Sequence, residues 1–216
     1  MHATLSGANK QEDAVIDYLR GGFGHVSAER ALSGGGIVNL YQALAAIDGV
    51  TVPEREASGI TAAAASGTCP LSREALNMFC AMLGTFAGNA ALTLRAQGGV
   101  FISGGIVPRI HGFLEQSQFR SRFEAKGRFS KHVSKIGTYV ITHDDPAFIG
   151  LQALAEKMLN TVNCFAARED EDEHTTGPAF GLKSKTGVSV RNEASESEPA
   201  LRSPGHARKA PAIRAW

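Results

Sequence analysis

Apolar residues recur at helical spacing through most of the first 156 residues of the chain. Between residues 35 and 47 they stand at every third or fourth position, so an amphipathic helix is predicted there. Weaker versions of the same spacing predict helices over residues 11–19 and 58–65. A long helix is predicted over residues 72–94, opening at Pro70 because proline suits the first turn of a helix.

The predicted long helix carries two glycines, Gly84 and Gly88, which stand one turn apart. A glycine inside a helix costs about 1 kcal/mol relative to alanine. We therefore expect another stretch of backbone to pack closely against the helix at these two positions.

Two short β-branched segments, residues 98–103 and 138–142, have the pattern of buried strands. Each is followed by a predicted helix, over residues 106–116 and 147–157. Two strands that each lead into a helix indicate an α/β arrangement with parallel pairing. The intervening segment, residues 119–133, is predicted to form short helices that cover the sheet.

The composition of the chain changes near Lys157. An acidic block at residues 169–173 and an aperiodic mixture of Gly, Ser, Pro, Lys and Arg follow. Such a segment buries too little apolar surface to offset the entropy lost on ordering, so we expect disorder over residues 160–216. The predicted organisation is a folded region over 1–156 and a polar tail over 157–216, with binding of the tail to a partner as the alternative.

The chain has 43% hydrophobic and 20% charged residues and a formal net charge of +1. This balance gives no electrostatic reason to expect nucleic acid or an anionic membrane as a partner. No apolar stretch is expected to reach the roughly 20 residues of a membrane span, so we expect a soluble, cytoplasmic protein. Cys69, Cys80 and Cys164 are too few and too widely spaced for a disulfide framework or a zinc site, and we expect reduced, mostly buried thiols.

Gly104 and Gly105 stand where the first predicted strand ends and a helix follows. Glycines at this place let a ligand approach the backbone closely, and a helix start offers unpaired N–H groups, so a nucleotide could bind there. The spacing is neither Gly-x-Gly-x-x-Gly nor a Walker loop, and a purely structural tight turn is the alternative.

A polar block over residues 24–36 holds the second candidate site. Ser27 is expected to cap a helical turn that carries Glu29, and the glycines after it let the chain reverse. The carboxylate of Glu29 could accept hydrogen bonds from two neighbouring sugar hydroxyls. An ordinary surface turn at Glu29 and Arg30 is the alternative.

Other polar residues offer weaker candidates. His111, His132 and His143 lack the spacing of metal ligands, so surface or capping roles are expected. Asp144 and Asp145 precede a proline, which favours a helix cap over a pair of catalytic carboxylates. No Gly-x-Ser-x-Gly elbow is present, so a serine hydrolase is not supported.

Several blocks together resemble the carboxyl-terminal half of bacterial glucokinase, in register over about residues 2–156. The main ones are Gly-His-Val-Ser-Ala-Glu-Arg-Ala-Leu-Ser-Gly at residues 24–34 and Gly-Gly-Val-Phe-Ile-Ser-Gly-Gly-Ile-Val-Pro-Arg at residues 98–109. Shorter matching blocks lie at residues 36–41, 119–129 and 143–146.

The resemblance implies a ribonuclease-H-like large domain of the hexokinase and actin-like superfamily, helix-rich with a small, partly parallel sheet. It implies transfer of phosphate from ATP, with Mg²⁺, to the 6-hydroxyl of glucose. Glu29 occupies the position of a sugar-contacting glutamate of the family, and His2 corresponds to the family's sugar-contacting histidine. Gly104 and Gly105 match the nucleotide side of the family's cleft, so we expect them and Glu29 to border one hollow.

The departures from the family pattern concern catalysis. The family's amino-terminal Asp-x-Gly-Gly-Thr loop, its Asn-Asp pair with the general base, and its second glycine turn have no counterpart in the 216 residues. No catalytic residue is therefore assigned, and we expect negligible turnover by the chain alone. The alternatives are a non-catalytic sugar binder, a subunit completed by a separate amino-terminal chain, and a chain that folds poorly because its sheet edge is open. As partners we expect glucose, ATP and either a second copy in a homodimer or a complementing amino-terminal chain.

Overall fold

The computed structural model describes residues 2–143, 145–172 and 213–215, with side chains described through residue 159. The chain divides into two compact units. The first unit contains the described residues up to 143 together with residues 213–215. The described part of the second unit is residue 145 and helix α8 (Pro146–Asp172).

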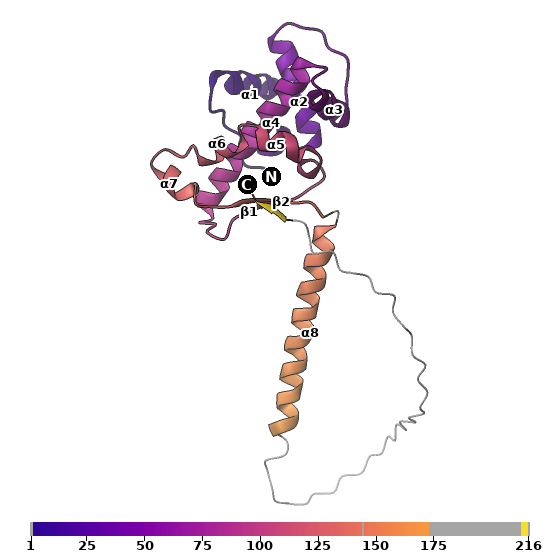
Figure 1. Cartoon of the computed structure of the whole chain (residues 1–216), viewed down its shortest axis with the longest axis vertical. Coiled ribbons are helices and arrows are strands. Elements are labelled where there is room, and N and C mark those ends of the chain that lie inside the picture. Colours follow the sequence, from indigo (N-terminus) through magenta and orange to yellow (C-terminus); the bar gives the residue numbers. More distant parts are fainter. Residues whose placement is uncertain (1, 144, 173–212, 216) are drawn as a thin grey trace, which may run out of the picture. The chain divides into compact units, whose positions relative to one another are not determined.

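Most of the first unit is helical (Figure 1). The predicted helices are all present, with bounds that differ from the sequence expectation by a few residues at most places. The α-helices are α1 (Lys10–Phe23), α2 (Gly34–Ile47), α3 (Ala57–Ser66), α4 (Pro70–Thr93), α5 (His111–Gln116), α6 (Phe119–Glu124) and α7 (Ser130–Val133). Three 3₁₀ turns join them, η1 (Ala28–Arg30), η2 (Val107–Ile110) and η3 (Gly127–Phe129).

Helix α4 forms the centre of the core and packs against α2, α3 and α6. A Cβ atom on Gly84 would collide with the carbonyl oxygen of Phe119, and one on Gly88 would collide with that of Phe123. The missing side chains thus let the backbone of α6 lie directly on α4. The prediction of a close backbone neighbour at the two glycines is confirmed.

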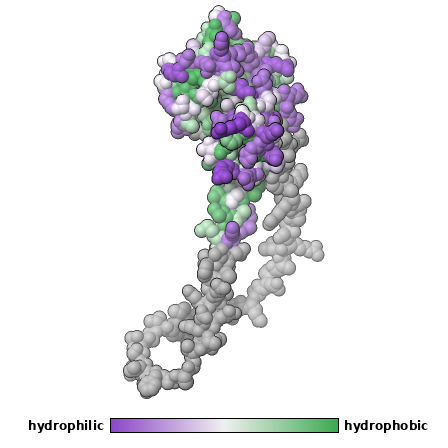
Figure 2. Space-filling view, turned by 90° about the vertical axis from the view of Figure 1, so that its left-hand side faces the viewer, coloured by the Kyte–Doolittle hydropathy of each residue, from purple (hydrophilic) through white to green (hydrophobic). Residues whose placement is uncertain are grey.

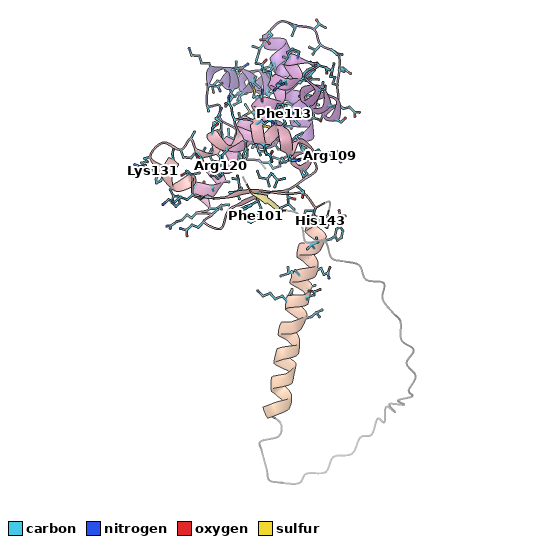
Figure 3. All side chains as sticks on the ribbon, in the orientation of Figure 1. Phe101, Arg109, Phe113, Arg120, Lys131 and His143 are labelled. Atoms are coloured by element: carbon cyan, nitrogen blue, oxygen red, sulfur yellow. The ribbon has the colours of Figure 1, made fainter. Side chains whose placement is uncertain are left out.

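The sheet is small and partly parallel, as predicted. Strands β1 (Val100–Ile102) and β2 (Thr138–Ile141) pair in parallel, with Val100 opposite Thr138. A third strand, β3 (Ile213–Ala215), pairs antiparallel with β2 and was not expected. The ring of Phe101, labelled in Figure 3, stacks on Tyr139 with 4.9 Å between ring centroids.

Helix α8 extends well past the predicted end at residue 157, because it continues to Asp172. The expectation of disorder from residue 160 is therefore wrong for residues 160–172. That segment contains neither glycine nor proline, so nothing local ends the helix. The rest of the predicted tail up to residue 212 lies outside the described residues, and the boundary at residue 156 stays a prediction.

A buried ion pair joins α1 to α6. Arg122 donates to both carboxylate oxygens of Glu12, at 2.6 and 2.9 Å. The same carboxylate accepts from the backbone N–H of Ala8 at 2.8 Å and from Nδ2 of Asn9 at 3.0 Å. The guanidinium also donates to the hydroxyl of Thr85 on α4, at 3.1 Å, so three helices meet at this network.

Helix α4 is also long and apolar enough to cross a membrane by length and composition, with a mean hydropathy of 1.3 over 18 residues. This differs from our expectation, because alanines and glycines extend the apolar run between the large side chains. Of that window, 61% is buried inside the folded chain, which is typical of a core helix.

The two cysteines with described side chains are unpaired, as expected. Cys80 is buried, and burial raises the pKa of its thiol to about 12. Cys69 is half-buried at the start of α4, and hydrogen bonds from Ser72 lower the pKa of its thiol. The side chain of Cys164 lies outside the described ones.

Candidate functional site

The amino-terminal segment lies beside the 3₁₀ turn that carries Glu29. The N–H of Leu5 donates to the carbonyl of Val26 at 3.0 Å, and the N–H of Ala28 donates to the carbonyl of Ala3 at 2.8 Å. This short antiparallel pairing brings His2 next to Glu29, with 3.8 Å between Nε2 and Oε2. The structure thus brings together the two residues that the sequence analysis assigned to one site.

A hollow of about 360 Å³ opens beside this pair. It faces solvent, since the side chains of His2 and Glu29 are 87% and 53% exposed. Nε2 of His25 lies 3.2 Å from the carbonyl oxygen of His2, which places a second imidazole there. The lining residues are His2, Phe23, His25, Ser27, Glu29, Arg30, Ser33, Gly35 and Asn39.

The start of α2 forms the opposite side of the hollow. Oγ of Ser33 accepts from the N–H of Gly36 at 2.9 Å and so caps the helix. One turn on, Nδ2 of Asn39 donates to the carbonyl of Arg30 at 2.8 Å, which connects α2 to the turn of Glu29. Ser27 precedes η1 as expected, but its side chain makes no capping hydrogen bond, so that part of the prediction is wrong.

The side chains around this hollow suit a neutral, hydroxyl-rich ligand. A carboxylate, two imidazoles, an amide and hydroxyls offer both donors and acceptors. The ring of Phe23 lies at the rim with the guanidinium of Arg30 stacked on it, 4.1 Å from the ring centroid. The sequence analysis missed Ser33, Asn39 and Phe23. Only the Ser-Gly-Gly-Gly run ahead of an apolar repeat, a helix-start signal, could have indicated Ser33.

The turn after β1 borders a second hollow, of about 270 Å³. Gly104 has a φ of +125°, which side chains rarely tolerate, so the turn requires glycine at this position. Gly105 lines the hollow together with Arg109, which Figure 3 labels. Ser58 and Thr61 of α3 line the same space. A cation, hydroxyls and an open glycine backbone are groups that could hold a phosphate.

The two hollows share no lining residue, so the expectation that Glu29 and the Gly104 turn border one hollow is not met in the described part of the chain. Helix α2 stands between the two hollows. It contributes Gly35 and Asn39 to the first and Ile37 to the second. Successive residues of an α-helix are about 100° apart, so Ile37 points about 200° away from Gly35 and Asn39. Helix α2 therefore presents opposite faces to the Glu29 hollow and the Gly105 hollow.

The weaker candidate residues make structural contacts or lie outside the described residues. Nδ1 of His111 lies 2.9 Å from the carbonyl oxygen of Pro108, a capping contact. Asp144 is outside the described residues, and α8 begins at Pro146, two residues later. Among the described side chains, no group of three or more His, Cys, Asp or Glu residues could hold a metal ion.

A family model described as Glucokinase matches residues 1–158 of the chain. The chain is 52% identical over 153 residues to a glucokinase of Paramagnetospirillum magneticum, covering 71% of this chain and 48% of that protein. It is 49% identical over 152 residues to a glucokinase of Chromobacterium violaceum, covering 70% and 44%. The chain thus spans about half the length of the curated relatives it matches.

Solved structures of glucokinases share the fold of this chain. The crystal structure of a glucokinase from an Antarctic psychrotroph superposes with a TM-score of 0.64 at 38% identity, covering 67% of this chain and 45% of that chain. A glucokinase from Balamuthia mandrillaris, solved in complex with glucose, superposes with a TM-score of 0.57 at 21% identity, covering 66% and 42%. The hexokinase-like fold expected from the sequence is therefore shown.

Proposed function

The chain belongs to the glucokinase family, and from that premise we propose that it forms one side of a site that phosphorylates glucose with ATP. In this proposal the hollow beside Glu29 binds glucose, and the space beside Gly105 receives ATP. Because the two spaces lie on opposite faces of α2, the terminal phosphate of ATP has to extend past that helix to reach the sugar. The family's reaction transfers the terminal phosphate of ATP to a sugar hydroxyl, as a step of sugar breakdown in the cytoplasm.

The observation that carries the proposal is the approach of His2 to Glu29 across the mouth of one hollow, at 3.8 Å. The carboxylate can accept from two adjacent hydroxyls, and the imidazoles and the amide of Asn39 can hydrogen-bond the others. The ring of Phe23 offers an apolar surface to the C–H groups of a sugar. Recognition of an uncharged ligand therefore needs no cation or metal at this hollow.

The proposed ATP side relies on the turn at Gly104 and Gly105. The glycines let phosphates approach the backbone, and Arg109 adds a fixed positive charge beside them. Mg²⁺ would arrive bound to the phosphates, as is common for nucleotide substrates. Its role would be to neutralise charge on the transferring phosphate.

Turnover requires groups that we do not assign to this chain. A base within reach of the attacking hydroxyl and a loop that holds the phosphates are needed for the transfer. The proposal is that the half of the fold outside the matched region supplies them, in a separate amino-terminal chain or in a longer polypeptide. Alone, the 216 residues would bind glucose with negligible turnover.

A second candidate function is a non-catalytic sugar binder. It is favoured by one observation: all nine residues that line the Glu29 hollow come from the first compact unit, so the hollow forms without help from other chains. The two candidates share the glucose site and differ in whether a completing chain restores phosphoryl transfer.

Calorimetry with glucose tests the shared site. Glu29→Ala should weaken glucose binding at least about tenfold, because a charged acceptor to two hydroxyls is lost. Glu54→Ala, which removes an exposed carboxylate from the loop before α3, is the matched control and should bind as the unmodified chain does. Equal affinity of both variants, or no binding by the unmodified chain, would refute the proposal. A coupled assay with ATP and Mg²⁺ then separates kinase from binder.

A further inference from the structure

Glu29 is one of many polar side chains at the surface of the first unit. Hydrophilic residues are spread over much of the face shown in Figure 2, and the side chain of Glu29 is 53% exposed. Packing alone therefore does not hold its carboxylate in place. The anchoring of the backbone at Glu29 decides whether this carboxylate is a preset acceptor for a ligand.

The backbone is anchored on both sides of Glu29. The N–H of Ala28 donates to the carbonyl of Ala3 at 2.8 Å, and the carbonyl of Arg30 accepts from Nδ2 of Asn39 at 2.8 Å. Glu29 thus lies between two residues that are held by different parts of the chain, the amino-terminal segment and helix α2.

A second contact shows how closely the turn of Glu29 lies on α2. A Cβ atom on Gly36 would collide with the carbonyl group of Ala31, so the glycine lets the backbone of the turn reach the helix. Asn39 follows Gly36 by three residues and therefore lies on the same face of α2. The turn meets α2 at two places, a glycine that allows the approach and an amide that bonds it.

The hydrogen bond from Asn39 matters more to the turn than to the helix. Backbone hydrogen bonds hold α2 over 14 residues, whereas the 3₁₀ turn η1 is three residues long. The bond ends on Arg30, directly after Glu29, and both Asn39 and Glu29 line the same hollow. Asn39 is therefore in a place from which it can set the position of Glu29.

We propose that Asn39 is a positioning residue, which holds the turn through Arg30 so that the carboxylate of Glu29 is preset to accept from sugar hydroxyls. The inference rests on the proposed glucose site and adds to it a residue that acts through Glu29. A preset carboxylate binds more tightly, because binding does not then have to order the turn.

Calorimetry with glucose gives the first test. Asn39→Ala removes the amide and keeps a good helix former in α2, and it should weaken glucose binding about fivefold, the value of one hydrogen bond. Gln42→Ala is the matched control. Gln42 is exposed, lies three residues further along α2 and does not line the Glu29 hollow, so its loss should leave the affinity unchanged.

The same substitutions in a Glu29→Ala chain separate positioning from direct contact with the sugar. If Asn39 acts through Glu29, Asn39→Ala should change the affinity less than about twofold once the carboxylate is gone. Titrations followed by NMR up to high glucose concentration measure this weaker binding. An equal loss in both backgrounds would show that Asn39 acts without Glu29 and would overturn the inference.

Amide hydrogen exchange without sugar tests the turn itself and does not depend on the proposed function. The N–H groups of residues 30, 31 and 32 donate to carbonyls within the turn at 2.8 to 3.2 Å. Asn39→Ala should raise their exchange rates at least about fivefold and leave those of α4 unchanged, whereas Gln42→Ala should change neither.

Unchanged exchange in the turn of the Asn39→Ala chain would overturn the role of Asn39. The same acceleration in α4 would also overturn it, because the substitution would then weaken the whole fold. An unmodified chain that binds no glucose would instead refute the proposed function, so the two failures are distinguishable.

Discussion

The buried pair of Glu12 and Arg122 offers the sharpest test of how the first unit is held together. The perturbation is Arg122→Met, which keeps much of the apolar stem and removes the guanidinium. Glu12 is 2% exposed, so the substitution leaves a buried carboxylate without its cationic partner. The two residues are 110 positions apart in sequence and lie on α1 and α6, so the substitution removes a contact between two helices.

The magnitude follows from what remains around the carboxylate. Removing one partner of a buried ion pair costs about 3–5 kcal/mol, because the other charge stays buried and unpaired. The N–H of Ala8 and Nδ2 of Asn9 continue to donate to Glu12, and the side chain of Arg122 is 14% exposed. Both facts favour the lower end of that range, so we expect a loss of about 3 kcal/mol in the free energy of unfolding.

Urea unfolding followed by circular dichroism at the helical band measures this loss. Asp17→Asn is the control, because the Asp17–Arg20 pair is mostly exposed and should contribute less than about 1 kcal/mol. Combining Arg122→Met with Glu12→Gln should recover part of the loss, since no unpaired charge remains. A loss below about 1 kcal/mol for Arg122→Met, or no recovery in the double variant, would refute the reasoning.

Three further predictions concern α4 and the residue that precedes it. Gly84→Ala should lower the unfolding midpoint and cost about 1–3 kcal/mol in stability, because the new methyl group collides with the backbone of α6. Gly112→Ala is the control and should leave the midpoint unchanged, because a Cβ there meets nothing within 4 Å. Equal effects of the two substitutions would contradict the packing argument. Cys69 should react with iodoacetamide at lower pH than an ordinary thiol, because hydrogen bonds from Ser72 lower its pKa and so favour the thiolate. Cys80, with a pKa raised to about 12 by burial, should react only after unfolding in urea, and peptide-resolved mass spectrometry would show alkylation of the folded chain at Cys80 if this is wrong.

The helices and the parallel strand pair could be predicted because their signals are local. The apolar repeat of α2 and the proline at the start of α4 depend only on neighbouring residues. A close backbone neighbour at Gly84 and Gly88 was predictable, because glycines inside a helix are costly unless something packs against them. That the neighbour is α6 was not predictable from the sequence. Strand β3 was not predictable, because its partner strand lies more than 70 residues earlier in the chain.

The site was predictable where a local polar pattern or a family pattern indicated its residues. Both patterns indicated Glu29, only the family pattern indicated His2, and the structure brings the two residues together. Asn39 and Phe23 join them through the geometry of two helices, which no local pattern states. The separation of the Gly105 hollow from the Glu29 hollow depends on the width of α2 and could not be seen from spacing along the chain.

The two glycine contacts between α4 and α6 fix the position of one helix along the other. Gly84 meets Phe119 and Gly88 meets Phe123, so four residues on one helix correspond to four on the other. Sliding α6 by one turn would keep one of these contacts and drive the second carbonyl against a position that carries a side chain. If α6 slid by less than one turn, both carbonyl oxygens would collide with side chains of α4. The two helices must therefore move as one rigid body, and any movement in this part of the molecule has to occur in the segments that connect them to the other elements.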